Sequence, residues 1–484
     1  MKRERQHDVA TVGNGPTVRV LLDLTTAWIW RGKEAVGIIR TEREIALHLL
    51  RDPLLTVLPF VFRDGRLRAV DPAFAQSMLT ERTPAAPTAA PATSTPRAPP
   101  RSTFARIVAP FAGLARLCVR VALRGVPEGA REDVSLSLIH LRAAVRRLIY
   151  PVRAAPPKPP ASTVASASLG VAVNPDLSLI VHPRLGDVLF TCGLGWSDFE
   201  WSPISSLKAR RQLRVVSMVY DMIPILFPAW IPAGHDLYLA HFLSLVDTTD
   251  EVTCISRCTE RDLRAFAESH GRKPPSTHVV RLGAELPAAA DSDGIDPDLV
   301  RKLSGNKFAL AVGTFEVRKN YGLLLDVWDR LTRDPDFELN LVIVGMRGWK
   351  ADDVIDRLES SPLNGRRIFW LRDLRDNALS WLYTRCHIAV YPSLYEGWGL
   401  PVVEALQHRR PVIASNRGAV PEAGLGIAQI IDPDDLPAWC DAVAKSDRAA
   451  RVENPPVTLP SWDEAAATIR SILLASTVSG TVAA

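Results

Sequence analysis

The chain has 484 residues, of which 47% are hydrophobic and 23% are charged, as is usual for a folded globular protein. Its formal net charge is +5, and the excess of positive charge lies in one segment, residues 97–158, which argues against a general nucleic-acid-binding surface. No apolar run is long enough to predict a membrane-spanning helix. The first residues lack the apolar stretch of a secretion signal, and the six cysteines are scattered. The length predicts about three domains, or two larger α/β domains with additions. We expect a cytoplasmic protein with no nucleic-acid partner.

The first predicted elements are typical of a parallel α/β sheet. Val18–Leu24 is an apolar run that predicts a strand, and we expect the polar and aromatic residues Thr25–Val36 to form a loop at its carboxyl end. A helix is predicted over Gly37–Leu50 from its apolar spacing, and a further strand over Leu55–Phe62.

Three residues at the start of this helix are candidates for a binding site. Ligands of open α/β sheets bind beyond the carboxyl ends of the strands, which is where Gly37, Arg40 and Thr41 are expected. For Arg40, a plain helix start with a surface arginine is the alternative.

Residues 83–170 differ in composition from the rest of the chain. Two Pro/Ala-rich tracts, which cannot bury much apolar area, are expected to be linkers: Thr83–Pro100 and Pro156–Ser168. Residues 97–158 contain twelve Lys or Arg and three Asp or Glu. Two basic amphipathic helices are predicted between the tracts, Phe104–Arg124 and Leu136–Tyr150. Residues 104–150 are thus candidates either for peripheral contact with an anionic membrane or for a helical hairpin docked on the protein itself.

Two polar residues follow the next buried strand, Val215–Val219. Asp221 stands at the carboxyl end of that strand directly after Tyr220, so its carboxylate can contact a ligand in the cleft. Asp221 can equally cap the following turn. Farther along, Ser256 is expected to cap a helix over Glu260–Ala267.

A second domain is predicted to begin with the buried strand Phe308–Gly313. The adjacent cations Arg318 and Lys319 lie between this strand and a predicted helix over Tyr321–Leu331. At a strand's carboxyl end and before a helix N-terminus, such a pair can clamp a diphosphate. A solvated charge pair at a helix start is the alternative.

Residues 387–415 combine a buried strand, a glycine-rich turn, a helix and a second strand. The strand is His387–Tyr391, and Gly397 and Gly399 in the turn let backbone N–H groups approach a ligand. Leu400 and Pro401 are expected to open the helix, whose positive end faces the turn and favours phosphate.

Two carboxylates frame this turn, Glu396 before the helix and Glu404 about one turn into it. Carboxylates accept hydrogen bonds from hydroxyl groups and repel phosphate, so these two side chains are suited to a sugar and a ribose. A ligand with an anionic middle and hydroxylated ends is a nucleotide sugar.

These residues carry a family resemblance. Glu396 and Glu404, eight positions apart around GWGLP, resemble the E-x7-E motif of retaining GT-B glycosyltransferases of glycosyltransferase family 4. Four other segments are similar to that family, closest to bacterial mannosyltransferase-like members of polysaccharide biosynthesis: GIIRTE, YDMIP, VGTFEVRKN and NRGAVPE. Tyr220 departs from the family pattern, which has a histidine at its position.

The resemblance implies an α/β chain of GT-B fold, with two Rossmann-like domains whose parallel sheets face across a cleft. The acceptor domain would span residues 17–285, including a helical basic insert at 83–170. The nucleotide-sugar domain would span 300–455, and a terminal helix over 460–476 would cross back to the first domain.

It also implies site residues. Those of the catalytic centre would be Glu396, Lys319, Arg318 and Asp221. Donor-binding residues would be Gly37, Gly397, Gly399, Leu400, Glu404, Arg372 and Leu374, the last two in the loop that contacts the base. Acceptor-binding residues would be Arg40, Thr41 and Tyr220.

The predicted reaction moves a sugar, mannose from GDP-mannose by resemblance, to a glycan or lipid-linked glycan with retention of configuration. We expect no cofactor and no metal, because the three Asp-Pro-Asp triplets read as turns. A nucleotide-sugar 2-epimerase and a non-catalytic GT-B scaffold that binds glycans are the alternatives. The expected location is the cytoplasm, with the inner face of the plasma membrane as the site of any peripheral contact.

Overall fold

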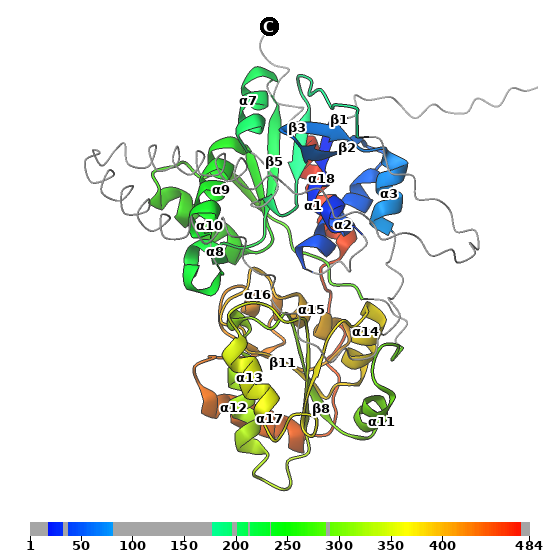
Figure 1. The fold of residues 1–484 in the computed structure, drawn as a ribbon, viewed down its shortest axis with the longest axis vertical. Helices are drawn as coiled ribbons and strands as arrows, with labels where there is room; N and C mark the ends of the chain where they lie inside the picture. Colours follow the sequence, from blue (N-terminus) through cyan, green and yellow to red (C-terminus); the bar gives the residue numbers. More distant parts are fainter. Residues whose placement is uncertain are drawn as a thin grey trace, which may run out of the picture. The chain divides into compact units, whose positions relative to one another are not determined.

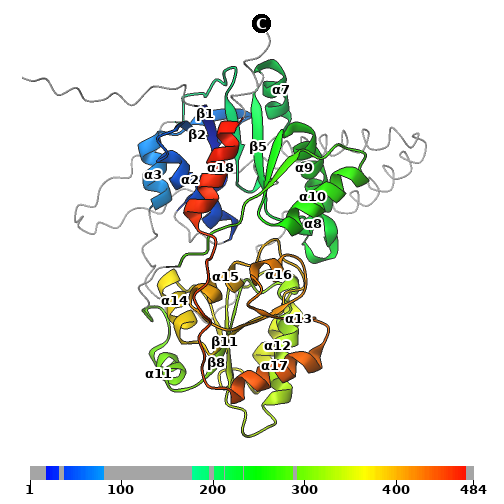
Figure 2. The same cartoon turned by 180° about the vertical axis from the view of Figure 1, so that it is seen from behind.

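A computed structural model of the chain describes residues 18–31, 37–80, 177–195, 201–211, 213–232, 234–286 and 291–475. Within these ranges the chain forms two α/β domains, each built on a parallel sheet (Figures 1 and 2). The predicted insert at 83–170, with its two basic helices, lies outside the described residues. No helix in the described ranges is long and apolar enough to cross a membrane.

The first sheet has seven strands in the described residues, in the order β3-β2-β1-β4-β5-β6-β7. Neighbouring strands run parallel except β2 and β3, which pair antiparallel. The strands are β1 (Val18–Asp23), β2 (Leu55–Arg63), β3 (Arg66–Ala69), β4 (Val188–Thr191), β5 (Arg214–Val219), β6 (Glu251–Cys254) and β7 (Ser276–Val279). Val20 and Leu22 pack in one buried cluster and Leu21 in another, so both faces of this sheet are covered.

The helices described in the first domain are α1 (Thr25–Ile29), α2 (Ile38–Leu50), α3 (Pro72–Thr80), α7 (Trp201–Arg211), α8 (Ile223–Leu226), the 3-10 helix η2 (Pro228–Trp230), α9 (His235–Thr248) and α10 (Arg257–Ser269). The loop predicted over Thr25–Val36 is therefore wrong in its first part. The Asp23 carboxylate accepts a hydrogen bond from the Thr25 backbone N–H at 3.0 Å. This bond satisfies an amide that a helix start leaves without an intrahelical partner, and so favours α1.

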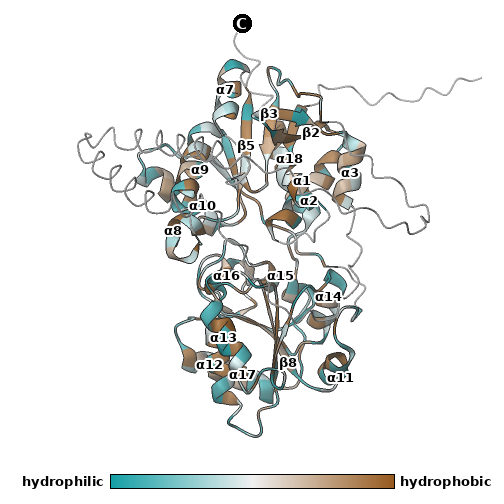
Figure 3. Ribbon diagram, in the orientation of Figure 1, coloured by the Kyte–Doolittle hydropathy of each residue, from teal (hydrophilic) through white to brown (hydrophobic). Residues whose placement is uncertain are grey.

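The second sheet has six parallel strands in the described residues, in the order β10-β9-β8-β11-β12-β13. They are β8 (Phe308–Val312), β9 (Asn340–Val344), β10 (Ile368–Leu371), β11 (Ile388–Tyr391), β12 (Val412–Ser415) and β13 (Gln429–Ile431). The helices of this half are α11 (Pro297–Gly305), the 3-10 helix η3 (Val317–Lys319), α12 (Tyr321–Leu331), α13 (Asp352–Ser360), α14 (Asp376–Arg385), α15 (Leu400–Gln407), α16 (Val420–Ala423) and α17 (Leu436–Arg448). Strands β5 and β8 are buried along most of their length and are hydrophobic in Figure 3.

The last helix, α18 (Trp462–Leu474), returns to the first domain and packs on α2. It begins with a capping box, in which the Ser461 side chain accepts from the Glu464 N–H while the Glu464 side chain accepts from the Ser461 N–H. At its other end, Arg214 of β5 donates to the carbonyl oxygens of Ile472 and Leu473 at 2.6 and 3.0 Å. These bonds anchor the C-terminal segment on the first sheet.

Two local predictions are confirmed. The Ser256 hydroxyl oxygen accepts from the Thr259 N–H at 3.0 Å and caps α10. In each Asp-Pro-Asp triplet the first carboxylate accepts from the backbone N–H of the third residue, at 2.8 to 3.0 Å, with Asp296, Asp334 and Asp432 as the acceptors. The triplets are turns closed by their own side chains.

Candidate functional site

The carboxyl ends of β8 and β11 bring the two predicted cations beside the first predicted carboxylate. These strands are neighbours in the second sheet, so the segments that follow them meet at one edge. Lys319 Nζ donates to Glu396 Oε1 at 2.7 Å and to the Tyr391 hydroxyl at 2.7 Å. Arg318 pairs with Glu396 and, at 3.1 Å, with Glu316 Oε1. We call these five residues the Glu396 cluster.

The backbone around the two cations explains how Lys319 reaches the cluster. Gly313 has a φ of +149°, which favours glycine, and a Cβ there would lie 2.9 Å from Lys319 Cε, so a larger residue would displace this side chain. Asn320 has left-handed backbone angles and donates to the Pro392 carbonyl at 3.3 Å. The Leu394 N–H donates to the Arg318 carbonyl at 2.7 Å. The turn after β8 and the loop after β11 are thus held together by one side-chain and one backbone hydrogen bond.

The cluster is charged although it is buried. Burial alone would raise the pKa of Glu396, but Arg318 and Lys319 outweigh this effect and lower that pKa to about 2. Burial lowers the pKa of Lys319, and the charge of Glu396 opposes that shift. Burial also opposes the charged form of Arg318, but the carboxylates of Glu396 and Glu316 raise its pKa overall. Glu396 is therefore ionised at neutral pH and can accept hydrogen bonds.

The second predicted carboxylate, Glu404 of α15, has different partners. Arg40 of α2 in the first domain pairs with Glu404 Oε1 at 3.2 Å, and the Tyr383 hydroxyl donates to Oε2 at 3.0 Å. Burial raises the pKa of Glu404, and these two donors reduce the shift without reversing it. We call Glu404, Arg40 and Tyr383 the Glu404 cluster.

The three residues predicted at the start of the first-domain helix lie together. The Gly37 carbonyl accepts from the Thr41 N–H at 3.1 Å and from the Thr41 hydroxyl at 3.2 Å. Arg40 donates to the Glu285 carbonyl at 2.5 Å as well as to Glu404. Arg40 is therefore engaged with the second domain, which a plain surface arginine would not be. The Thr41 hydroxyl, in contrast, is used within its own helix.

The end of β5 meets the glycine-rich turn of the second domain. A Cβ on Gly397 would lie 2.1 Å from the Tyr220 carbonyl oxygen, so the backbones approach too closely for any larger residue. Asp221 accepts from the Ile223 N–H at 3.0 Å, which is the capping alternative. Burial raises the pKa of Asp221, and the positive charge of Arg318 opposes that shift. Asp221 therefore interacts electrostatically with Arg318 of the Glu396 cluster. The Tyr220 hydroxyl donates to the Cys192 carbonyl and is committed within the first domain.

The remaining residues that were predicted to bind the donor are Gly399, Leu400, Arg372 and Leu374. Gly399 precedes α15, and its carbonyl accepts from the Val402 N–H at 2.9 Å, while Leu400 is the first residue of that helix. Arg372 follows the edge strand β10, which β9 and β8 separate from β11, and its guanidinium stacks on Trp370 at 3.7 Å. Leu374 packs against the hydrophobic core from the same loop. The structure thus does not bring Arg372 into the Glu396 cluster.

Sequence reasoning missed several of the residues that make up these clusters. Glu316 was detectable, because it lies two positions before Arg318 in the same segment. Tyr391 and Tyr383 carry no such signal, since each is an apolar-patterned residue of a strand or helix whose hydroxyl finds its partner only on folding. In the described ranges no group of three or more His, Cys, Asp and Glu side chains is arranged to hold a metal ion.

Comparisons with known proteins found a family model that matches the second-domain part of both clusters. Residues 297–424 match the family model of glycosyl transferases group 1. The serotype-specific mannosyltransferase WbdA of Escherichia coli is 34% identical over 206 residues, which are 40% of this chain and 25% of WbdA. The O-antigen chain mannosyltransferase B of Escherichia coli is 37% identical over 140 residues, 28% of this chain and 36% of that protein. The chain thus spans between a quarter and just over a third of these relatives.

Among solved structures, Anabaena HepE in complex with UDP and glucose aligns over 94% of this chain and 95% of its own, with a TM-score of 0.49 and 12% identity. The arrangement seen here, two parallel-sheet domains and a last helix that returns to the first, is the GT-B architecture. The segment that carries Lys319, Glu396 and Glu404 thus lies within the match to the glycosyl transferases group 1 family model, and the chain has the GT-B fold.

Proposed function

We propose that this chain is a retaining glycosyltransferase that moves mannose from GDP-mannose to a glycan or lipid-linked glycan in the synthesis of a surface polysaccharide. The observation that carries the proposal is the Glu396 cluster, in which the cations Arg318 and Lys319 are held against the ionised carboxylate of Glu396 beside the start of α15. A nucleotide sugar needs both kinds of group, since its diphosphate is anionic and its sugar carries hydroxyl donors.

The chemistry follows from these charges. The bond between the anomeric carbon and the diphosphate oxygen breaks, the bond to the acceptor oxygen forms, and negative charge develops on the leaving diphosphate. Fixed cations aimed at that charge stabilise the transition state, which is the role proposed for Lys319 and Arg318. Glu396 would accept hydrogen bonds from the donor sugar's hydroxyls and Glu404 from the ribose. By family resemblance the departing phosphate takes the acceptor's proton, so no protein base and no metal is required.

The choice of mannose and of a polysaccharide acceptor rests on the relatives. WbdA and mannosyltransferase B are mannosyltransferases by name, and the second is an O-antigen chain enzyme. Arg40, Asp221 and Tyr220 would lie on the acceptor side, because they come from the first domain. Arg372 and Leu374 would contact the base.

A donor screen tests the proposal. Purified protein would be incubated with GDP- and UDP-sugars, with and without an oligomannose acceptor, and nucleotide release and the anomeric configuration of the product would be measured. We expect acceptor-dependent GDP release from GDP-mannose and an α-linked product. Release of a 2-epimerised sugar without acceptor would indicate an epimerase. Absence of GDP and UDP binding by calorimetry would indicate a scaffold.

The predicted peripheral membrane contact through residues 104–150 lies outside the described residues and remains a proposal, as does the cytoplasmic location. Deleting residues 84–165 and comparing membrane fractions tests it. The proposal requires the deletion to release the protein from anionic vesicles without abolishing donor hydrolysis or transfer. Unchanged vesicle binding would favour the docked hairpin.

A further inference from the structure

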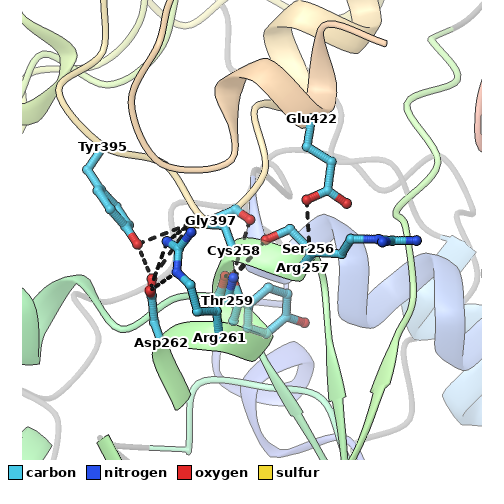
Figure 4. A network of polar contacts seen from close by, with 10 residues as sticks. Ser256, Arg257, Cys258, Thr259, Arg261, Asp262, Tyr395, Gly397 and Glu422 are labelled. Atoms are coloured by element: carbon cyan, nitrogen blue, oxygen red, sulfur yellow. Dashed lines mark hydrogen bonds and ion pairs between the residues drawn. The ribbon is translucent and has the colours of Figure 1, made fainter. Parts of the chain in front are cut away.

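The N-terminal part of helix α10, in the first domain, contacts the loop that carries Glu396. Figure 4 shows these contacts, which involve three groups of the second domain: the Tyr395 hydroxyl, the Gly397 carbonyl and the Glu422 carboxylate. Tyr395 is the residue directly before Glu396.

The Tyr395 side chain is held at several points. Its hydroxyl donates to Asp262 and lies 3.2 Å from Cys258 Sγ, and Arg261 donates to the other oxygen of Asp262 at 3.1 Å (Figure 4). The Tyr395 ring lies 5.0 Å from the ring of Phe227, also in the first domain. Burial and the hydrogen bond to Asp262 raise the pKa of Tyr395, so the hydroxyl keeps its proton and remains a donor. The contact is therefore both polar and aromatic.

The two other groups contact the first turn of α10. The Thr259 hydroxyl lies 3.0 Å from the Tyr220 carbonyl and 3.3 Å from the Gly397 carbonyl, so its single proton is shared between the two domains. Glu422 Oε2 accepts from the Arg257 backbone N–H at 3.0 Å. A carboxylate at this position also interacts favourably with the positive end of α10. On the side of the second domain, the Glu396 carbonyl accepts from the Ala419 N–H at 3.0 Å.

We propose that these contacts form an interdomain clasp, made of Tyr395, Gly397 and Glu422 on one side and Arg257, Thr259 and Asp262 on the other, and that Tyr395 is a positioning residue for Glu396. The clasp holds the residues on both sides of Glu396, and the Ala419 N–H holds the Glu396 carbonyl, so both domains position this carboxylate. This inference rests on the proposed function, because the aimed carboxylate is the one that would hold the donor sugar.

The clasp separates donor binding from turnover. Lys319 and Arg318 pair with Glu396 within the second domain and need no clasp to hold the diphosphate. Transfer needs the acceptor as well, whose proposed residues lie in the first domain. Loss of the clasp should therefore lower kcat while the Kd for GDP stays almost unchanged, whereas a general loss of folding would lower kcat and raise that Kd.

The test compares Tyr395→Phe and Asp262→Ala with the wild-type chain. Each is expected to lower kcat for mannose transfer at least about tenfold and to leave the calorimetric Kd for GDP within about twofold. Asp262→Asn keeps an oxygen that accepts from Tyr395 and should recover most of the rate. The double variant should be no slower than the slower single variant. Arg264→Gln is the matched control, because Arg264 pairs with Glu260 and Thr277 within the first domain.

A second readout does not depend on sugar transfer. Amide hydrogen exchange of residues 393–399 and of the first turn of α10 should be faster in Tyr395→Phe than in the wild type and unchanged in Arg264→Gln. Unchanged exchange would overturn the clasp, and a wild-type kcat in Tyr395→Phe would overturn the positioning role. If no nucleotide sugar is turned over, the proposed function fails, while the exchange experiment still decides whether the clasp exists.

Discussion

The Glu396 and Glu404 clusters come from one motif and are buried to the same degree, yet their carboxyl groups behave in opposite ways. Glu396 is 6% exposed and Glu404 is 5% exposed. The pKa of Glu396 is lowered to about 2, whereas the pKa of Glu404 is raised. Burial favours the neutral form of both side chains. The difference arises because Glu396 pairs with two cations and Glu404 with one, at a longer distance of 3.2 Å.

The clusters also differ in where their cations come from. Arg318 and Lys319 belong to the same domain as Glu396, on a neighbouring strand end, so that cluster is complete within the second domain. Arg40 comes from the first domain, so the charge on Glu404 depends on contact between the domains. We infer that Glu396 stays ionised whatever the contact between the domains, and that the ionisation of Glu404 changes with that contact.

The largest effect is expected for Lys319→Ala. It removes one of the two cations that hold the proposed leaving diphosphate, so nucleotide release with acceptor should fall by about 10²- to 10³-fold. Arg318 still pairs with Glu396, so circular dichroism should show an intact fold. Lys302→Ala is the control, since Lys302 donates to the Arg366 carbonyl elsewhere in the second domain. Near-normal turnover in Lys319→Ala would contradict the assignment of the cluster to the diphosphate.

The opposite pKa shifts predict opposite pH dependences of stability. The lowered pKa of Glu396, about 2 against 4.5, should contribute about 3 kcal/mol of stability above pH 4.5 that is lost as the pH falls toward 2. The raised pKa of Glu404 favours folding when this group is protonated, and that contribution is lost as the pH rises through the folded-state pKa.

Urea unfolding of Glu396→Gln and Glu404→Gln between pH 2 and 8 measures these slopes. Relative to the wild type, Glu396→Gln should lose stability as the pH rises from 2 to 5, and Glu404→Gln should gain stability as the pH rises through the pKa of Glu404. If both variants ran parallel to the wild type at all pH values, the two carboxyl groups would not differ as described.

A smaller effect is expected for Arg40→Met, which removes the contribution of the first domain to the Glu404 cluster. Glu404 then keeps only the Tyr383 donor, and the affinity for the donor nucleotide sugar should fall about tenfold, the usual scale for one charged hydrogen bond. Calorimetric titration measures this loss, and combination with Glu404→Gln should add little. Arg43→Met on the same helix is the control, because Arg43 donates to the Leu79 carbonyl in the first domain. Full additivity of the two substitutions would show that Arg40 does not act through Glu404.

No effect is expected from metal removal. If Lys319 and Arg318 supply the charge that stabilises the diphosphate, turnover in excess EDTA should stay within about twofold of the untreated rate. A loss that Mg²⁺ or Mn²⁺ restores would mean that the cations of the Glu396 cluster are not sufficient.

Much of this arrangement could be predicted from local patterns. The paired cations before α12, the two glutamates around GWGLP and the caps at Ser256 and Ser461 all have short-range signals, because the groups involved are close in the chain. The strand order came only from the structure: β8 and β11 are parallel neighbours, so the segments after them meet at one edge and bring Lys319 to Glu396. The helix at Thr25–Ile29 was not predicted from apolar spacing. What favours it is the hydrogen bond from the Thr25 N–H to the Asp23 carboxylate at its start.

The sequence alone thus predicted that charged side chains lie at the carboxyl ends of the strands, and which of them are cationic and which are acidic. Folding decided which partner each charged group found: Tyr391 for Lys319, Tyr383 and Arg40 for Glu404, and Asp262 for Tyr395. These partners lie between 21 and 364 positions away in the chain, and their own sequence context is that of ordinary core or surface residues. The pKa of a buried carboxyl depends on such distant neighbours and on their distances, which exist only in the folded molecule.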